Sequence, residues 1–381
     1  MYKRQSLDNI LDKSLTAWEK LYGAEPSERS FSLRFAGIIE RACKQAGQRV
    51  VILVDEYDKP MLQAIGNEEL QRQFRNALKP FYGALKTMDG CIKFAFLTGV
   101  TKFGKVSVFS DLNNLDDISM RKDYVELCGV SDRELHDTLD AELHEFADVR
   151  GVTYDKLCAE LKECYDGYHF THNSIGMYNP FSLLNAFKYK EFGSYWFETG
   201  TPTYLVSLLK KHHYDLERMA HEETDAQVLN SIDSESTNPI PVIYQSGYLT
   251  IKGYDEEFGI YRLGFPNREV EEGFVRFMLP YYANVNKVES PFEIQKFVCE
   301  VRSGDYDSFF RRLQSFFADT TYEVIRDQEL HYENVLFIVF KLVGFYTKVE
   351  YHTSEGRIDL VLQTDKFIYI CLLYTSDAAD E

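Results

Sequence analysis

The chain has 381 residues, of which 45% are hydrophobic and 15% aromatic, and its formal net charge is −18 at pH 7. A single hydrophobic core rarely grows beyond about 250–300 residues, so this length predicts two or three domains. The apolar content excludes a disordered acidic protein. The negative charge argues against broad binding to the DNA backbone or to anionic membranes, although it leaves room for a local basic groove.

The seven cysteines are scattered and form no Cys-x-x-Cys pair, which is typical of reduced thiols and favours the cytoplasm. Cys158, Cys164, His169 and His172 form the one metal-like cluster, but their spacing fits no common zinc pattern, and we interpret them as core and loop residues. No stretch reaches the roughly 18 apolar residues of a membrane helix, so we expect no membrane partner.

The first part of the chain carries the pattern of a βαβ unit. Apolar residues at helical spacing predict two amphipathic helices, at 7–21 and 31–42. An unbroken β-branched run at 50–54 then predicts a strand buried on both faces of a parallel sheet. A helix with an apolar stripe over 70–85 and a second apolar strand at 91–97 complete the unit.

After Gly129 the pattern changes to helices rich in Leu, Glu and Tyr, the first of them preceded by a capping box from Ser131 to Glu134. Short Tyr- and Ile-rich runs between 239 and 266 predict a small antiparallel sheet. Its expected strands lie at 242–244, 248–251 and 260–263. The last elements expected are an apolar helix at 335–343 and strands at 347–351, 357–362 and from 367.

The strongest local signal is the run from Val51 to Glu56, in which four apolar residues are followed by two acids at the carboxyl end of the predicted strand. This is the Walker B pattern, where the first acid holds Mg²⁺ and the second polarises the attacking water. Asp55 is therefore the candidate metal and cofactor ligand, and Glu56 the candidate catalytic residue. Taken alone, the run fits equally well a buried strand that ends in a solvated Asp-Glu turn.

The segment Gly99–Lys105 matches Gly-x-x-x-x-Gly-Lys, but we reject it as a phosphate-binding loop. Val106 stands where a Ser or Thr should reach Mg²⁺, and such a loop normally precedes the acidic strand. Thr98, at the tip of the neighbouring strand, is the better candidate for cofactor binding, as a polar residue facing the γ-phosphate or its water. Lys102 and Lys105 are then solvated charges or anion contacts.

Several long motifs, in a constant order, resemble the bacterial AAA-ATPase-like family. They are Leu53–Pro60, Phe96–Phe103, Phe109–Leu115, Tyr165–Phe170, Tyr178–Ser182, Tyr195–Pro202 and Tyr244–Thr250. The resemblance spans nearly all of residues 6–370 and implies an α/β fold. It implies a partial P-loop NTPase (AAA-like) parallel sheet at 6–128, a mostly helical lid or winged region with a small sheet at 129–285, and the start of a restriction-endonuclease-like α/β domain at 286–370.

Members of this family typically carry an ATPase core with a phosphate loop, and many end in a nuclease domain of the PD-(D/E)xK type. In that nuclease fold an Asp on one strand and a Glu-x-Lys on the next bind Mg²⁺ and activate water. Asp359 fits the first position as a catalytic and metal-binding residue, and Glu333, on the preceding helix, fits a helix-borne acid. The Glu-x-Lys should follow Ile370 directly and is missing. Asp359 also fits a strand-edge acid paired with Arg357.

The resemblance further implies that the phosphate loop lies upstream of this chain. Residues 1–5 and 371–381 look like translated sequencing adapter, so we expect both ends to be non-native. The expected cofactors are ATP and Mg²⁺, and the expected partners are a nucleotide and, through the C-terminal domain, nucleic acid; an oligomer stays open. One hypothesis is an inactive fragment of a Mg²⁺-dependent ATPase coupled to a nuclease-like domain. The other is a non-hydrolysing scaffold that binds a protein partner.

Two further motifs have both a functional and a structural interpretation. Arg121 could reach the phosphates of a neighbouring subunit, but a surface salt bridge is the favoured interpretation. Asp166, Tyr168 and His169, with Asn179 and Pro180, lie in an aromatic loop region, where such clusters more commonly form packed corners than catalytic sites.

Overall fold

The computed structural model describes residues 4–64, 67–100, 112, 114–199, 203–230, 238–283, 285–318, 328–346, 348–354 and 357–372. The chain divides into two compact units. The first comprises Met1–Tyr124, Thr224–Leu249 and Tyr254–Tyr261, and the second Val125–Glu223, Thr250–Gly253 and Arg262–Glu381. The domain boundaries expected from the sequence stay predictions.

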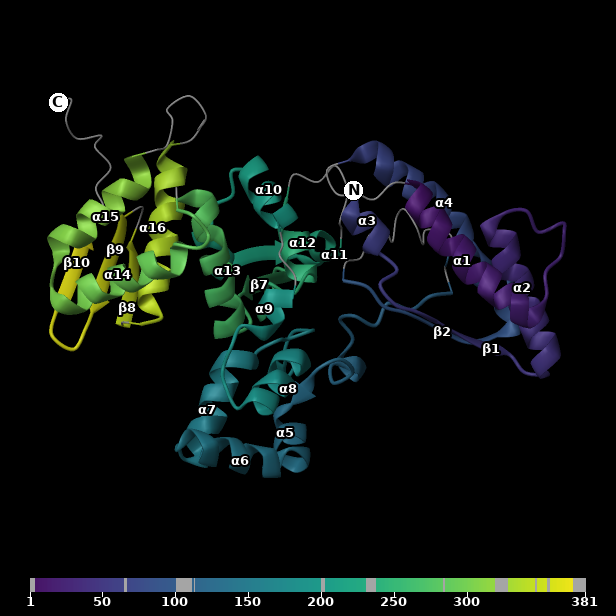
Figure 1. Ribbon diagram of the computed structural model, residues 1–381, viewed down its shortest axis with the longest axis horizontal. Helices are drawn as coiled ribbons and strands as arrows, with labels where there is room; N and C mark the ends of the chain where they lie inside the picture. The colour runs from purple at the N-terminus through teal and green to yellow at the C-terminus, as the bar shows by residue number, and fades with distance from the viewer. Residues whose placement is uncertain are drawn as a thin grey trace. The chain divides into compact units, whose positions relative to one another are not determined.

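The first unit contains a βαβ unit preceded by two helices, as the sequence predicts. Its elements are α1 (Arg4–Tyr22), α2 (Phe31–Ala46), β1 (Val50–Val54), α3 (Lys59–Gln63), α4 (Glu68–Thr87), η1 (Asp89–Cys91), β2 (Ile92–Leu97), η2 (Lys122–Tyr124), α11 (Ala226–Asn230) and α12 (Ile240–Gln245). Strands β1 and β2 pair in parallel, with Val54 opposite Leu97. The helices α1, α2 and α4 pack together beside these strands (Figure 1).

The core of this unit lies between the helices and one face of the β1–β2 pair. Phe35 on α2 stacks on Phe81 of α4, with 4.7 Å between the ring centroids. The half-buried strand residues Val50, Ile52 and Val54 pack against the same cluster. Alternate side chains of a strand point to opposite faces, so the residues between them point away from this core.

The expectation that β1 is buried on both faces is wrong. Val51 is 55% exposed and Leu53 is 72% exposed, and Phe94 on β2 is likewise exposed on the described surface. The helices of this unit cover one face only, which produces the alternating burial along β1. An unbroken apolar run therefore does not by itself distinguish a strand covered on one face from a strand covered on both.

The second unit is mostly helical and ends in an antiparallel sheet. Its elements are β3 (Val130–Ser131), α5 (Asp132–Thr138), α6 (Asp140–Arg150), α7 (Tyr154–Tyr165), β4 (Met177–Tyr178), α8 (Pro180–Tyr189), α9 (Tyr195–Thr199), α10 (Thr203–Lys211), η3 (Glu217–Ala220), α13 (Arg268–Tyr282), α14 (Ser290–Ser303), α15 (Tyr306–Ala318), α16 (Gln328–Gly344), β8 (Lys348–Ser354), β9 (Arg357–Gln363) and β10 (Ile368–Leu372). The capping box from Ser131 to Glu134 is confirmed, because both of its reciprocal hydrogen bonds are present.

The predicted small sheet is partly correct. Strands β5 (Glu222–Asp225), β6 (Thr250–Asp255) and β7 (Ile260–Gly264) form a sheet in the order β5-β7-β6. The prediction of a strand at 242–244 is wrong, because this run is part of α12 (Ile240–Gln245). Pro241 in the first turn of this helix supplies the φ angle that a helix start needs, and this local signal outweighs the β-branched residues after it.

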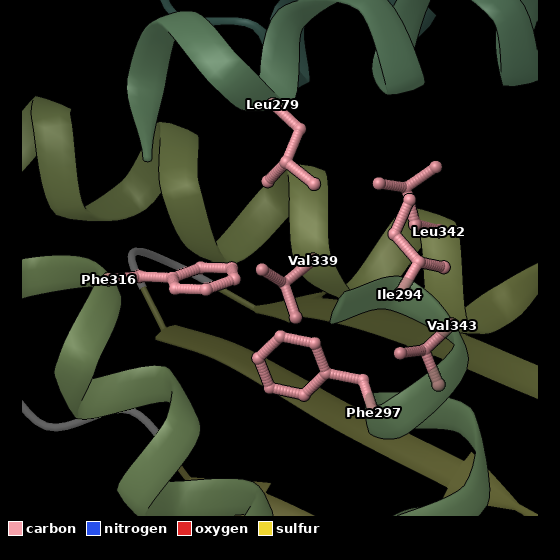
Figure 2. Close-up of a pocket in the computed structure, with 7 residues that line it drawn as sticks. All are labelled: Leu279, Ile294, Phe297, Phe316, Val339, Leu342 and Val343. Atoms are coloured by element: carbon pink, nitrogen blue, oxygen red, sulfur yellow. The ribbon is translucent and has the colours of Figure 1, made fainter. Parts of the chain in front are cut away.

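The C-terminal helices bury an apolar core beside the last sheet, whose strands lie in the order β10-β9-β8 (Figure 1). Figure 2 shows the meeting point of Leu279, Ile294, Phe297, Phe316, Val339, Leu342 and Val343. These seven side chains leave no room for a water molecule between them, so they form packed core and no ligand site. Within the described ranges, every helix is too short or too polar to span a lipid bilayer.

Candidate functional site

The first candidate site lies where β1 and β2 end. Because the two strands are parallel, their carboxyl ends meet at one edge of the sheet. Thr98 continues the ladder beyond β2: its amide donates to Val54 O at 2.8 Å, and its carbonyl accepts from Tyr57 N at 3.0 Å. This pairing places the residues that follow β1 beside the residues that follow β2.

Asp55 and Thr98 are in direct contact at this edge. Thr98 Oγ1 donates to Asp55 Oδ1 at 2.6 Å, and the backbone amide of Glu56 donates to the same oxygen at 3.0 Å. The Asp55 side chain is exposed and Thr98 is half-buried. Two donors therefore fix the orientation of the carboxylate while leaving it open to solvent. The sequence predicted that both residues belong to one site, and they are neighbours.

Glu56 has an unusual backbone conformation, with a φ angle of 51°. This left-handed region is costly for residues with a Cβ and tends to occur where function requires it. Its carboxylate is bound by the Lys59 ammonium, with 2.5 Å between Nζ and Oε2, and both side chains are about half exposed. Lys59 is a site residue that the sequence reasoning missed, although it stands three positions after Glu56 in the same motif.

Asp58 is a second missed residue, and it is only 1% exposed. Its Oδ1 accepts from the backbone amide of Val100 at 3.2 Å. Burial, followed by the Asp58 charge, raises the pKa of both Tyr57 and Tyr82 far above the usual range. No short-range pattern in the sequence signals this contact, because its partner lies 42 residues away.

This edge contributes one carboxylate whose orientation is fixed and which is open to solvent. An exposed carboxylate with a fixed orientation is the kind of oxygen ligand that Mg²⁺ takes. No cluster of three or more His, Cys, Asp or Glu side chains with metal-binding geometry exists in the part of the chain that the structure describes. The rejected phosphate-loop match continues into residues 101–105, which lie outside the described residues.

The second candidate site is the C-terminal sheet, where β9 is the central strand. Asp359 lies in β9 opposite His352 of β8 on one side and Leu372 of β10 on the other. Directly opposed residues of an antiparallel pair place their side chains on the same face of the sheet. The prediction for the Asp359 carboxylate itself falls outside the described side chains.

The Glu-x-Lys expected directly after Ile370 would begin at position 371, which lies opposite Leu360 in the register and not opposite Asp359. The position opposite Asp359 is occupied by Leu372, which offers no metal ligand. Positions 371 and 372 belong to the segment 371–381 that we expect to be non-native, so the register does not tell which residues the native strand carries there.

Glu333, the expected helix-borne acid, is exposed on α16. Its neighbour Asn334 is buried: Asn334 Oδ1 accepts from Leu216 N at 2.7 Å, and its Nδ2 donates to Tyr214 O at 3.1 Å. These contacts hold one face of α16 against the 214–216 segment. The role of Glu333 stays a prediction.

The remaining motif residues lie in packed corners or on the surface. Asn179 caps α8 by accepting from Phe181 N and Ser182 N. Asp166 is buried, and desolvation raises its pKa. Arg121 pairs with Asp116 at an exposed position, in agreement with the surface salt bridge favoured from the sequence.

The two thiols of the metal-like cluster, Cys158 and Cys164, are partly buried, and the absence of zinc there stays a prediction. Burial raises the pKa of Cys164 to about 12, and burial also raises the pKa of Cys158. A thiol must lose its proton to bind zinc, and these environments oppose that loss.

Comparisons with known proteins match one protein family to the N-terminal part of the chain and another to its C-terminal part. Residues 1–109 match the model of a predicted AAA-ATPase (AAA-ATPase-like), and residues 327–374 match that of the PD-(D/E)XK nuclease superfamily. An uncharacterized protein in the vnfD 5′ region of Azotobacter chroococcum mcd 1 is 33% identical over 378 residues, which cover 96% of this chain and 70% of that protein. No solved structure matches the chain. The chain therefore belongs to the family of predicted AAA-ATPase-like proteins that carry a PD-(D/E)XK nuclease-superfamily segment.

Proposed function

We propose that the edge formed by the ends of β1 and β2 is the Mg²⁺ half of an ATP-hydrolysing site. The observation that carries this proposal is the hydrogen bond from Thr98 Oγ1 to Asp55 Oδ1, at 2.6 Å, between the ends of two parallel strands. Ligands of open α/β sheets bind outside the carboxyl ends of the strands. A carboxylate held there by a neighbouring hydroxyl is placed to face a nucleotide and its metal.

Each residue of this edge has a distinct part in the proposal. Asp55 binds Mg²⁺ through its carboxylate, and Thr98 orients that carboxylate and faces the γ-phosphate or its water. Glu56 accepts a proton from the attacking water, which requires its carboxylate to leave Lys59. When bound, Mg²⁺ supplies positive charge to the phosphate oxygens. Glycine-rich backbone that could cradle phosphates is not among the described residues, so phosphate binding needs groups beyond them.

For the C-terminal segment we propose a nuclease-like fold that does not cleave nucleic acid in this chain. The sequence offers Asp359 without the Glu-x-Lys that a metal-dependent nuclease needs on the next strand. An Asp alone is an incomplete metal site. Nucleic-acid binding without cleavage is compatible with this arrangement.

The test of the ATPase proposal is Glu56→Gln in the whole protein. Removing a general base typically slows the chemical step by about 10²–10⁴-fold, so we expect kcat for ATP hydrolysis to fall in that range. ATP affinity, measured by titration, should change by less than about threefold, since Glu56 does not hold the metal.

The matched control is Glu40→Gln. Glu40 is also an exposed acid paired with a lysine, Lys44, at 2.6 Å, but it lies on α2. Hydrolysis by Glu40→Gln should equal that of the wild type. A wild type that binds a protein partner and hydrolyses no ATP would support the scaffold hypothesis instead.

A further inference from the structure

Asp58 is a buried acid at the start of a helix, but helix capping does not account for its burial. It is the N-cap residue of α3, and aspartate at an N-cap normally accepts hydrogen bonds from the first turn of its helix. Asp58 makes no such capping bond. Burying a carboxylate is unfavourable unless it is hydrogen-bonded, so the contact that Asp58 does make requires an explanation.

That contact connects the two loops of the candidate site. Asp58 lies in the turn after β1, and its Oδ1 accepts from the amide of Val100 in the loop after β2, at 3.2 Å. A second tie runs alongside, from Tyr57 N to Thr98 O at 3.0 Å. Thr98 is therefore held by its own backbone on one side and by Asp58, through Val100, on the other.

Gly99 allows the Asp58 carboxylate to come this close. A Cβ at position 99 would lie 2.6 Å from Asp58 Oδ1 and 2.7 Å from Tyr57 Cε1, closer than real Cβ contacts occur. The exposed loop thus has a glycine at the point where a buried carboxylate meets its backbone. Burial, and second to it the Asp58 charge, raises the pKa of both Tyr57 and Tyr82, which agrees with an aspartate near both side chains.

We propose that Asp58 is a positioning residue that holds the Thr98–Val100 segment in place, so that the Thr98 hydroxyl stays on Asp55. Its consequence for catalysis rests on the proposed ATPase function, but the positioning itself does not. Asp58 acts through the backbone of the neighbouring loop, because its Oδ1 accepts from the Val100 amide while the Thr98 hydroxyl donates to Asp55.

The positioning is tested by amide hydrogen exchange of the 97–100 segment in Asp58→Ala and Asp58→Asn. Loss of the acceptor in Asp58→Ala should speed exchange of the Val100 and Thr98 amides by about tenfold, the scale of one hydrogen bond. Asp58→Asn keeps an oxygen acceptor and should restore most of the protection. Unchanged exchange in Asp58→Ala overturns the proposal.

Asn67→Ala is the matched control, because Asn67 caps α4 by accepting from Leu70 N at 3.0 Å. It removes a comparable side-chain acceptor from the same unit and should leave exchange at 97–100 unchanged. If Asp58→Ala does not fold by circular dichroism, Gly99→Ala disturbs the same contact from the other side. Gly99→Ala should then show the faster exchange, and wild-type protection in that variant overturns the proposal.

Hydrolysis by the whole protein separates this inference from the proposed function. Asp58→Ala should lower kcat for ATP at least tenfold while KM changes less than about twofold, and Asp58→Asn should recover most of the rate. A wild type without ATP hydrolysis refutes the ATPase proposal, and the exchange measurements still decide the role of Asp58. Equal hydrolysis by Asp58→Ala and the wild type overturns its catalytic consequence.

Discussion

The β1–β2 edge and the β9–β10 pair each bring an acid next to a neighbouring strand, but the neighbour differs in kind. Asp55 meets the hydroxyl of Thr98, whereas the register partner of Asp359 is Leu372. Asp55 and Thr98 meet because the parallel strands β1 and β2 end at the same edge of the sheet. Asp359 and Leu372 meet because the register of the antiparallel strands β9 and β10 places them opposite each other. The strand pairing determines which two residues lie next to each other, and the types of those residues determine whether they can orient a carboxylate or bind a metal.

Among the substitutions that test the contrast between these two strand pairs, Thr98→Val should have the largest effect, because it removes the hydroxyl that contacts Asp55. The volume stays similar, but Asp55 loses the donor at 2.6 Å. A hydrogen bond to a charged group is worth about 1.5–3 kcal/mol, so ATP hydrolysis by the whole protein should fall roughly 10- to 100-fold. Thr87→Val, which removes only a helix-surface contact to Ala84 O, is the control. Equal rates of ATP hydrolysis in the wild type and Thr98→Val would show that the contact between Thr98 and Asp55 does not contribute to hydrolysis.

The converse change, Leu372→Glu, gives the second pair the acid that it lacks. Two carboxylates at directly opposed positions lie close enough to share one cation, so Mn²⁺ affinity measured by calorimetry should rise at least about tenfold. Adding Asp359→Asn should abolish the gain.

Ile368→Glu serves as the control for Leu372→Glu, because it adds the same charge on β10 opposite Gln363 instead of Asp359. It should leave Mn²⁺ affinity unchanged. An equal gain in both variants would mean that the β9–β10 register does not create the site.

A moderate effect on stability is expected at Asp166, a buried acid that contrasts with Asp58. Its Oδ1 has no hydrogen-bond partner among the described residues, and burial raises its pKa above 3.8. A raised folded-state pKa means that stability is greatest with the group protonated and is lost as pH rises through that pKa. Asp166→Asn mimics the protonated form, so its melting temperature should exceed that of the wild type by roughly 2–4 °C at pH 7.

The advantage of Asp166→Asn should vanish as the pH falls below 3.8, the unfolded value for this group. Thermal melts of both proteins across this pH range measure the difference. A gain that stays constant with pH would rule out the protonation mechanism.

The smallest effect is expected at the exposed face of β1. Leu53→Ser should change the free energy of unfolding by less than about 0.5 kcal/mol, as surface substitutions do. Ile52→Ala, on the face that packs against the core, should cost more than 1 kcal/mol in the same denaturant titration. A large loss in Leu53→Ser would show that this face is covered in solution.

The sequence alone predicts most helices and strands of the first unit, but it does not predict the features that depend on contacts between distant parts of the chain. The apolar run at 50–54, the helix at 70–85 and the second strand appear as expected, and the acids fall at the strand end. Burial on one face was not predictable, because it depends on which helices return to the sheet. Asp58 was missed for a similar reason, since its partner is distant along the chain.

The second unit shows a different limit. The 242–244 run has the composition of a strand, yet it lies in α12 because proline sets the helix start. For the C-terminal sheet, the strands were predictable from periodicity. That Leu372 lies opposite Asp359 follows only from the register, which local patterns do not specify.

The left-handed backbone of Glu56 has a practical consequence for engineering. A residue with a Cβ at a φ angle of 51° costs about 1–2 kcal/mol relative to glycine, which adopts this region freely. Glu56→Gly should therefore melt at a higher temperature while lacking the carboxylate proposed as the base. A library of this protein screened by heat resistance would enrich an inert variant at this position, so selection for robustness and selection for turnover would here work against each other.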